Sequence, residues 1–436
     1  MKTNKIVSII VLVAVLVATV AGAYLGLAGR ATQMVTVTEN GVETERALYR
    51  QVAFIPNTFN LSWQEAIVPS AQLGGGAEYV FGAVQGDMTD AEFNKAVKTA
   101  SKIMGERAAM MAGDANVKVD GATISVTVPG TEYDSTLANV VAPVGDVAFC
   151  LYDAATGMFG DALMTGENVK EAGYYSQGNT YYLQLQFNKK GQKALSSIAK
   201  ENAGNTLYVL QDGSYLGYFY LSEGMDTNLV NVTTDDWTYA LTAAVCLRTG
   251  ALPVAVALEN SLPAEGTHTA LMNIVITAMF IITALAALYL IIRGKIAGLT
   301  AVITLAAQGV VFCLVMALTA ISTDWKLTIT ALILLTACQL LFIAGLVMIN
   351  DKIAALTKHR ALNVALKQAM KNALKPLGTV YGALVILGFA MMICFPAQPA
   401  AILGRLVAIS GVISFAFIFV VLRVLVSCVV TLKKSK

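Results

Sequence analysis

The sequence predicts a polytopic α-helical membrane protein with six transmembrane helices and one large extracytoplasmic α+β domain. Three observations lead to this fold class. Of the 436 residues, 56% are hydrophobic and only 13% are charged, about half the charged fraction of a soluble globular protein. The polar residues are segregated, because 26 of the 28 acidic residues lie between Glu39 and Glu265. The remaining parts of the chain are apolar segments that are long enough to cross a bilayer.

Six apolar segments have this length, since about 20 residues in a helix span a hydrocarbon core of about 30 Å. They cover residues 6–29, 270–292, 297–320, 327–349, 377–395 and 402–430. Each must be helical, because lipid offers no hydrogen-bond partners to free backbone groups.

The distribution of Lys and Arg predicts the orientation of the chain. These residues gather before the first segment, after the second, in the fourth connection and at the C-terminus. If all four groups are cytoplasmic, both termini lie inside the cell and residues 31–268 lie outside. The outer block has 13 Lys and Arg against 26 Asp and Glu, so its net charge is −13. The sequence therefore predicts a multi-pass protein of the cell membrane.

This gives three expected domains: an N-terminal anchor over residues 1–29, an outer domain over 30–268, and a five-helix membrane domain over 269–436. The first segment has an alternative interpretation as a cleaved signal peptide with Ala21-Gly22-Ala23 as the cleavage site. Its apolar run exceeds the 7 to 15 residues usual for such a peptide, so a retained anchor is favoured. Gly22 and Gly26 have the spacing that lets another helix approach closely, although they are also ordinary residues of membrane helices.

The fourth connection, residues 351–375, is expected to form a cytoplasmic amphipathic helix. Six cationic side chains surround apolar residues at helical spacing, namely Ile353, Leu356, Leu362, Leu366, Met370 and Leu374. We expect this stripe to contact membrane lipid at the inner leaflet, with a solvated loop as the alternative.

The outer domain is expected to contain two ferredoxin-like β-α-β-β units. The first has a strand at 78–84, a helix that begins at the Thr89-x-x-Glu92 capping box, and strands at 117–119 and 123–128 around Asp120-Gly121. The second has a strand at 181–187, a helix at 190–202, and strands at 206–210 and 215–221 around Asp212-Gly213.

The second unit is rich in tyrosine, with Tyr174, Tyr175, Tyr181, Tyr182, Tyr208, Tyr215, Tyr218 and Tyr220. Exposed aromatic side chains beside polar backbone suit the binding of an extended chain without sequence preference. Tyrosine is also simply a good strand residue, and this second interpretation is the more economical one from sequence alone.

The chain shows no sign of catalysis. It lacks a phosphate-binding loop, a Gly-x-Ser-x-Gly elbow and a His-Glu-x-x-His helix, and Gly74, Gly75 and Gly76 precede a strand. Cys150 and Cys246 suit either a disulfide or two buried small hydrophobes, and the latter is favoured because both lie in apolar runs. We expect no enzyme activity, no cofactor, no metal and, because the outer block is acidic, no nucleic acid.

Several motifs resemble the SecD subunit family of the protein-export translocase. LGGGAEYV, which contains Gly74, Gly75 and Gly76, resembles the family's opening strand. Arg107 and Gly113 fit an arginine-and-glycine pattern at a helix end, and TISVTVPG resembles a strand that closes in Pro129-Gly130. LQLQFNKKGQKAL and ALNVALKQAMKNALKPL match further family segments. The most specific match is LRTGALPVAV, which contains Arg248, Gly250, Leu252 and Pro253.

The resemblance implies an accessory subunit that works with a SecF-like membrane protein beside the SecY channel and moves unfolded exported polypeptides across the membrane. Family members carry an Asp-Ala-Asn motif for proton coupling in the fourth span. Alignment of INDKI with the family's helix end places Ala344 at the position of the aspartate, so this chain is expected to lack proton coupling of its own. The alternative is a proton-independent interaction or scaffold protein, or half of a resistance-nodulation-division type transporter that binds another ligand.

Overall fold

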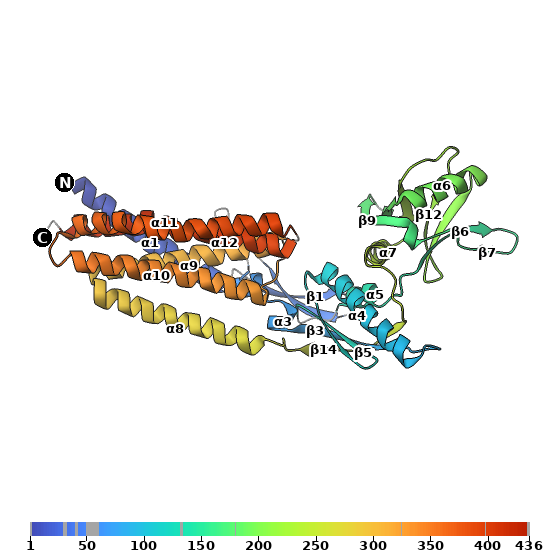
Figure 1. Cartoon of the computed structure of the whole chain (residues 1–436), viewed down its shortest axis with the longest axis horizontal. Coiled ribbons are helices and arrows are strands. Elements are labelled where there is room, and N and C mark those ends of the chain that lie inside the picture. The colour runs from blue at the N-terminus through green and yellow to red at the C-terminus, as the bar shows by residue number, and fades with distance from the viewer. Residues whose placement is uncertain are drawn as a thin grey trace. The chain divides into compact units, whose positions relative to one another are not determined.

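The computed structural model describes residues 2–28, 33–39, 42–48, 61–130, 134–178, 180–323, 325–396 and 398–433. The chain forms two compact units, Met1–Pro69 with His268–Lys436, and Ser70–Thr267 (Figure 1). We call them the membrane unit and the outer unit.

The membrane unit contains the six predicted spans. They are α1 (Lys2–Ala28), α8 (Thr269–Gly294), α9 (Ile296–Thr323), α10 (Ile329–Leu356), α11 (Leu362–Cys394), and a sixth helix made of α12 (Gln398–Ala416), the π-helical turn η3 (Phe417–Val421) and α13 (Leu422–Lys433). Among the described residues these are the six helices that are long and apolar enough to cross a membrane. The prediction of a multi-pass membrane protein is confirmed.

Close helix contacts explain two glycines of the first span. A Cβ atom at Gly22 would lie 2.8 Å from Val310 Cγ1 of α9, so this glycine permits the approach of the two helices. Gly26 lies against the ring of Trp63, which belongs to the short helix α2 (Trp63–Ala66). Residues 61–69 therefore pack with the membrane helices, and Ser70 is the first residue of the outer unit.

The basic fourth connection differs from the expected amphipathic helix over 351–375. Its first residues extend α10 to Leu356, and its later residues form the first turns of α11, which continues through Pro376. Ile353, Leu366 and Met370 are buried in the core of the membrane unit. Most of the apolar stripe thus packs on protein, whereas we expected lipid, because an apolar helix face gains as much from burial against a neighbouring helix. Leu374 is the exception, with 49% of its surface exposed.

The outer unit contains a four-stranded antiparallel sheet in the order β14-β3-β5-β4. Its strands are β3 (Gly76–Ala83), β4 (Asn116–Asp120), β5 (Thr123–Val128) and β14 (Val256–Ala264). Helix α4 (Asp90–Ala112) connects β3 to β4 and begins with the predicted Thr89–Glu92 capping box. The order is that of a ferredoxin-like fold whose last strand comes from far along the chain.

A larger sheet is inserted before β14, in the order β7-β6-β11-β12-β13-β10-β9. Its strands are β6 (Val147–Asp153), β7 (Met158–Phe159), β9 (Val169–Gln177), β10 (Thr180–Phe187), β11 (Thr206–Gln211), β12 (Ser214–Tyr220) and β13 (Leu229–Thr234), and the short strand β8 (Met164–Thr165) also pairs with β6. The predicted β-α-β-β order is present as β10, α6 (Lys189–Glu201), β11 and β12. Strand β13 lies between β12 and β10, and α6 and α7 (Trp237–Thr249) contribute to one apolar core with the sheet.

Candidate functional site

Arg107, near the end of α4, is the largest fully buried side chain of the chain's described part. Its guanidinium makes five hydrogen bonds, and every acceptor is neutral. Nε donates to Thr249 Oγ1 (3.1 Å), Nη1 donates to the carbonyls of Val141 (3.2 Å) and Pro143, and Nη2 donates to the carbonyls of Val144 (3.2 Å) and Gly250 (2.8 Å). We call this group the arginine clasp.

The clasp holds the two places where the chain passes between the two sheets. Residues 141–144 lead from α5 (Ser135–Val141) to β6 of the larger sheet, and Thr249-Gly250 ends α7 before the return to β14. The N–H of Leu252 also donates to the Val144 carbonyl, at 2.7 Å. Of the residues singled out in the sequence, the structure therefore brings Arg107, Gly250 and Leu252 together.

Three further groups surround the clasp. The carboxylate of Asp212 accepts hydrogen bonds from the N–H groups of Gly145 and Asp146. Gly145 has a φ of +82°, and a Cβ atom there would lie 2.8 Å from both Arg107 Nη2 and Cys246 Cβ. Burial lowers the pKa of Arg107, while Cys246 and Asp212 oppose this decrease. Burial also raises the pKa of Cys246 to about 11, so its thiol is protonated at neutral pH. Cys246 is a free thiol, as is the buried Cys150.

The glycines near the start of β3 allow several backbone segments to meet. A Cβ atom at Gly75 would lie 2.0 Å from the Ala264 carbonyl, and one at Gly76 would lie 1.9 Å from the Val128 carbonyl and 2.7 Å from that of Gly130. Gly74 is the last residue of α3 (Ala71–Gly74). Gly75 and Gly76 therefore serve close packing.

The other motif residues lie apart from the clasp. Gly113 ends α4 in the left-handed conformation with a φ of 76°, and Pro129 follows β5. Arg248 and Pro253 are exposed. The LRTGALPVAV motif thus contributes alternate residues to the interior, and Arg248 is on its outer side.

A row of tyrosines crosses one face of the larger sheet. Tyr208 pairs with Tyr218 on β12, Tyr218 pairs with Thr233 on β13, Thr233 pairs with Tyr182 on β10, and Tyr182 pairs with Tyr175 on β9. Directly paired residues lie on the same face of a sheet. We call Tyr175, Tyr182, Tyr208 and Tyr218 the tyrosine row.

The face that carries the row is exposed and aromatic at one side. The Tyr208 ring lies 5.5 Å from the ring of Phe159 and 6.0 Å from that of Tyr152, which is 47% exposed. Tyr218 contacts Tyr220, which is 65% exposed. Tyr215 also contacts Tyr208, whereas Tyr174 and Tyr181 lie against Trp237 of α7. The sequence did not reveal that Phe159 and Tyr152 lie beside the tyrosine row, because their position depends on the pairing of β6 with β7.

The membrane unit has no titratable group at the position where the sequence resemblance predicts a missing carboxylate. Ala344 lies near the middle of α10 on its exposed face. The next residue, Gly345, faces inward, where a Cβ atom would lie 2.3 Å from the Tyr381 hydroxyl oxygen. Gln308 of α9 and Gln339 of α10 exchange two side-chain hydrogen bonds, of 3.1 and 2.8 Å. This pair makes the interior of these helices polar here, and neither of its amide groups ionises.

No family model matches the chain, and no curated protein matches it by sequence. Among solved structures, the crystal structure of SecDF in its super-membrane-facing form matches with a TM-score of 0.67 and 16% sequence identity, over 84% of this chain and 54% of that chain. The chain has a SecDF-like fold.

Two further SecDF structures match less well. One is described as a membrane component that enhances protein export (TM-score 0.35, 14% identity, 43% of this chain and 99% of that chain). The other is a translocon-associated SecDF from Thermus thermophilus (TM-score 0.44, 16% identity, 96% and 58%). This chain spans about half the length of the SecDF chain that it matches best among these three.

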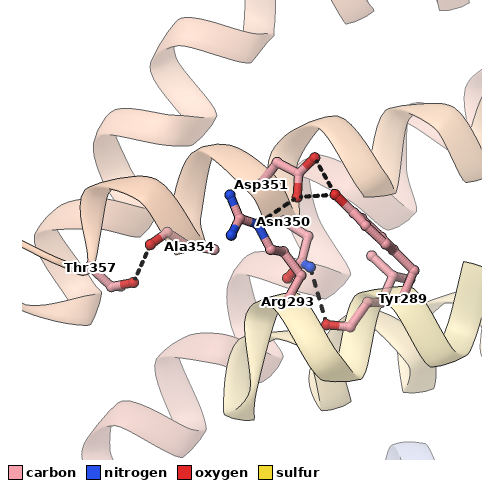
Figure 2. A network of polar contacts seen from close by, with 7 residues as sticks. Tyr289, Arg293, Asn350, Asp351, Ala354 and Thr357 are labelled. Carbon is pink, nitrogen blue, oxygen red and sulfur yellow. Dashed lines mark hydrogen bonds and ion pairs between the residues drawn. The ribbon is translucent and has the colours of Figure 1, made fainter.

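A polar network joins the ends of α8 and α10 in this SecDF-like membrane unit (Figure 2). The Tyr289 hydroxyl donates to the Asp351 carboxylate at 2.9 Å, and Arg293 forms an ion pair with the same carboxylate at 3.6 Å. Asn350 Nδ2 donates to the Leu290 carbonyl at 3.2 Å. The network holds two helix ends together. In the described part of the chain, no cluster of three or more His, Cys, Asp or Glu has the arrangement of a metal site.

Proposed function

We propose that this chain is a divergent SecD-like accessory subunit of protein export, which helps unfolded polypeptides to cross the membrane. The SecDF-like fold over most of the chain supports this role, as do the motifs around the arginine clasp. The proposed partners are a SecF-like membrane protein and the SecY channel, and this chain covers 54% of the SecDF chain that it matches. The role is binding and movement, without enzyme activity or a cofactor.

The observation that carries the proposal is the tyrosine row. Aromatic rings bind apolar side chains of any sequence, and phenol groups exchange hydrogen bonds with a peptide backbone. The ordinary pKa of a phenol, about 10, already leaves it a neutral donor at pH 7, and Tyr220 raises the pKa of Tyr218 further. The row crosses the strands from β9 to β11, which gives an extended chain several successive contacts. This geometry suits an unfolded polypeptide of any sequence.

The proposal includes movement without proton coupling by this chain. Proton transfer within the membrane needs a group that binds and releases a proton there. Ala344 and the Gln308–Gln339 pair supply no such group. A partner would have to provide the acid on the exposed side of α10.

The orientation is also part of the proposal: both termini lie in the cytoplasm and the outer unit lies outside. A single cysteine placed at Asp212 should react with an impermeant thiol reagent added outside, and one placed at Lys367 should not. The reverse labelling pattern would reject this orientation.

The function is tested with inverted membrane vesicles that contain the channel, its ATPase motor and this subunit, with or without a SecF-like partner. We expect this chain to increase export of a reporter protein at fixed ATP, and an uncoupler to leave that increase unchanged when the partner is absent. No increase under any condition would reject the export role. An increase that disappears with the uncoupler, without the partner, would instead reject proton independence alone.

A further inference from the structure

A groove of about 400 Å³ opens on the membrane unit beside the last span, at the end of the bundle that holds both chain termini. Residues of η3 and α13 form most of it, and Ser8 of α1 closes one side. Its walls include Phe419, Val420 and Val424, while Arg423, Ser427 and Thr431 make the floor partly polar. The mechanism proposed above does not use this groove.

Arg423 is the charged side chain of the groove. It is exposed, and no hydrogen bond or ion pair of its guanidinium occurs within the described part of the chain. An arginine inside a span is costly unless its charge is paired or reaches the interface. Among the described residues, the charge of Arg423 has no counterion.

The position of Arg423 along the helix brings its side chain within reach of the lipid headgroups. The last span, Ala400–Leu432, has 33 residues. Its length is about 50 Å, so about 10 Å extends beyond each side of a core of about 30 Å. Arg423 lies about 14 Å before Leu432, which is about 4 Å inside the core boundary. A flexible arginine side chain covers that distance to a phosphate group.

The hydroxyl groups in the groove are arranged as acceptors. Ser427 Oγ donates its hydrogen to the Arg423 carbonyl at 2.7 Å, and Thr431 Oγ1 donates to the Ser427 carbonyl at 3.0 Å. Their remaining lone pairs suit a ligand that carries hydroxyl donors beside an anionic phosphate. The π-helical turn η3 precedes Arg423 directly, and such turns are frequent at functional sites.

We propose that this groove binds one anionic phospholipid with a hydroxyl-bearing headgroup, of the phosphatidylglycerol class. The Arg423 guanidinium pairs with the phosphodiester, the Ser427 and Thr431 oxygens accept hydrogen bonds from the glycerol headgroup, and Phe419, Val420 and Val424 contact an acyl chain. The inference does not depend on the export function. It places the lipid in the leaflet next to Lys5 and Lys433, where positive charge favours anionic lipids.

The test is native mass spectrometry of the full-length protein in mild detergent, titrated with phosphatidylglycerol or phosphatidylcholine. We expect one phosphatidylglycerol to bind about tenfold more tightly than phosphatidylcholine, and Arg423→Gln to remove this preference. Arg405→Gln is the matched control, because Arg405 is an exposed arginine of the same span far from the groove, and it should keep the preference. Equal binding of both lipids to the wild-type protein would overturn the proposal.

Two further measurements cover other outcomes. Val424→Trp fills the groove and leaves Arg423 in place, so it should also remove the preference; retention of the preference would place the lipid elsewhere. Inorganic phosphate at equal concentration should not displace phosphatidylglycerol, and displacement would show an ion site only. In native membranes, a photoactivatable crosslinker at Val424 should capture lipid, and capture of a polypeptide instead would identify the groove as a protein interface.

Discussion

Arg107→Met removes all five hydrogen bonds of the arginine clasp while keeping an apolar side chain of similar length. The Val144 carbonyl retains the Leu252 N–H, so the carbonyls of Val141, Pro143 and Gly250 lose the donor that the clasp provides. A buried unsatisfied group costs about 1 to 3 kcal/mol, and entering water offsets part of this. For three carbonyls that lose their donor, we therefore expect the free energy of opening the clasp to be lower by about 3 to 5 kcal/mol.

The assay uses Cys246, whose buried thiol lies beside the clasp. Its labelling rate in the native protein reports how often the clasp opens, and mass spectrometry separates it from the other cysteines. A decrease of 3 kcal/mol corresponds to labelling that is more than about 100-fold faster. Arg107→Lys should show a smaller increase, because a lysine retains three donors.

Arg248→Met is the matched control. Arg248 lies on α7 near the clasp residue Thr249, but its side chain is exposed, so labelling of Cys246 should change by less than about threefold. Unchanged labelling in Arg107→Met would refute the view that Arg107 joins the two crossings. In that case Arg107 would have to act on a ligand. Loss of export in Arg107→Met without faster labelling of Cys246 would show this second role.

Three further predictions concern other sites. The unfolding free energy should fall by about 2 to 3 kcal/mol between about pH 9 and pH 11, because the pKa of the Cys246 thiol is near 9 in the unfolded chain and about 11 in the folded one. In urea titrations, Cys246→Ala should lack this decrease. An equal decrease in Cys246→Ala would contradict its assignment to Cys246. Replacing both Tyr208 and Tyr218 with alanine should weaken binding of an unfolded polypeptide about tenfold or more in fluorescence anisotropy, whereas Tyr239→Ala, at an exposed tyrosine of α7, should not; equal losses would point to a general defect. Ala344→Asp should lower membrane yield, by a cost of about 2.5 to 3.5 kcal/mol, without creating uncoupler-sensitive export; normal yield with new sensitivity would oppose this.

Local features of the fold were predictable because their causes lie within a few residues. The Thr89–Glu92 capping box needs only a side chain three positions away, and both contacts form in the structure. The Asp120-Gly121 and Asp212-Gly213 turns join antiparallel strands, with Gly121 and Gly213 at positive φ. The six spans follow from composition alone.

The sites depend on contacts that no local pattern contains. Arg107 meets Thr249 and Gly250 across more than 140 positions of sequence, so spacing cannot reveal the clasp. The tyrosine row depends on the register of four strand pairs, and a shift of one residue in any of them would move a tyrosine to the other face. The stripe through Leu366 and Met370 shows a third limit, since the same apolar periodicity suits lipid and protein alike.

Ala344 and Gly345 are adjacent in the sequence, but Ala344 is exposed and Gly345 is buried. This difference bears on the question of proton coupling. Gly345 is packed against Tyr381, so a larger residue there would disrupt the chain's own bundle, whereas position 344 is exposed and open to any side chain that lipid or a partner accepts. Alanine at 344 is therefore not required by internal packing. An acid at this position would have faced away from the Gln308–Gln339 pair and would have needed its polar surroundings from another subunit. In the role proposed above, alanine at 344 makes no such demand on a partner, and the internal packing of this chain does not depend on it.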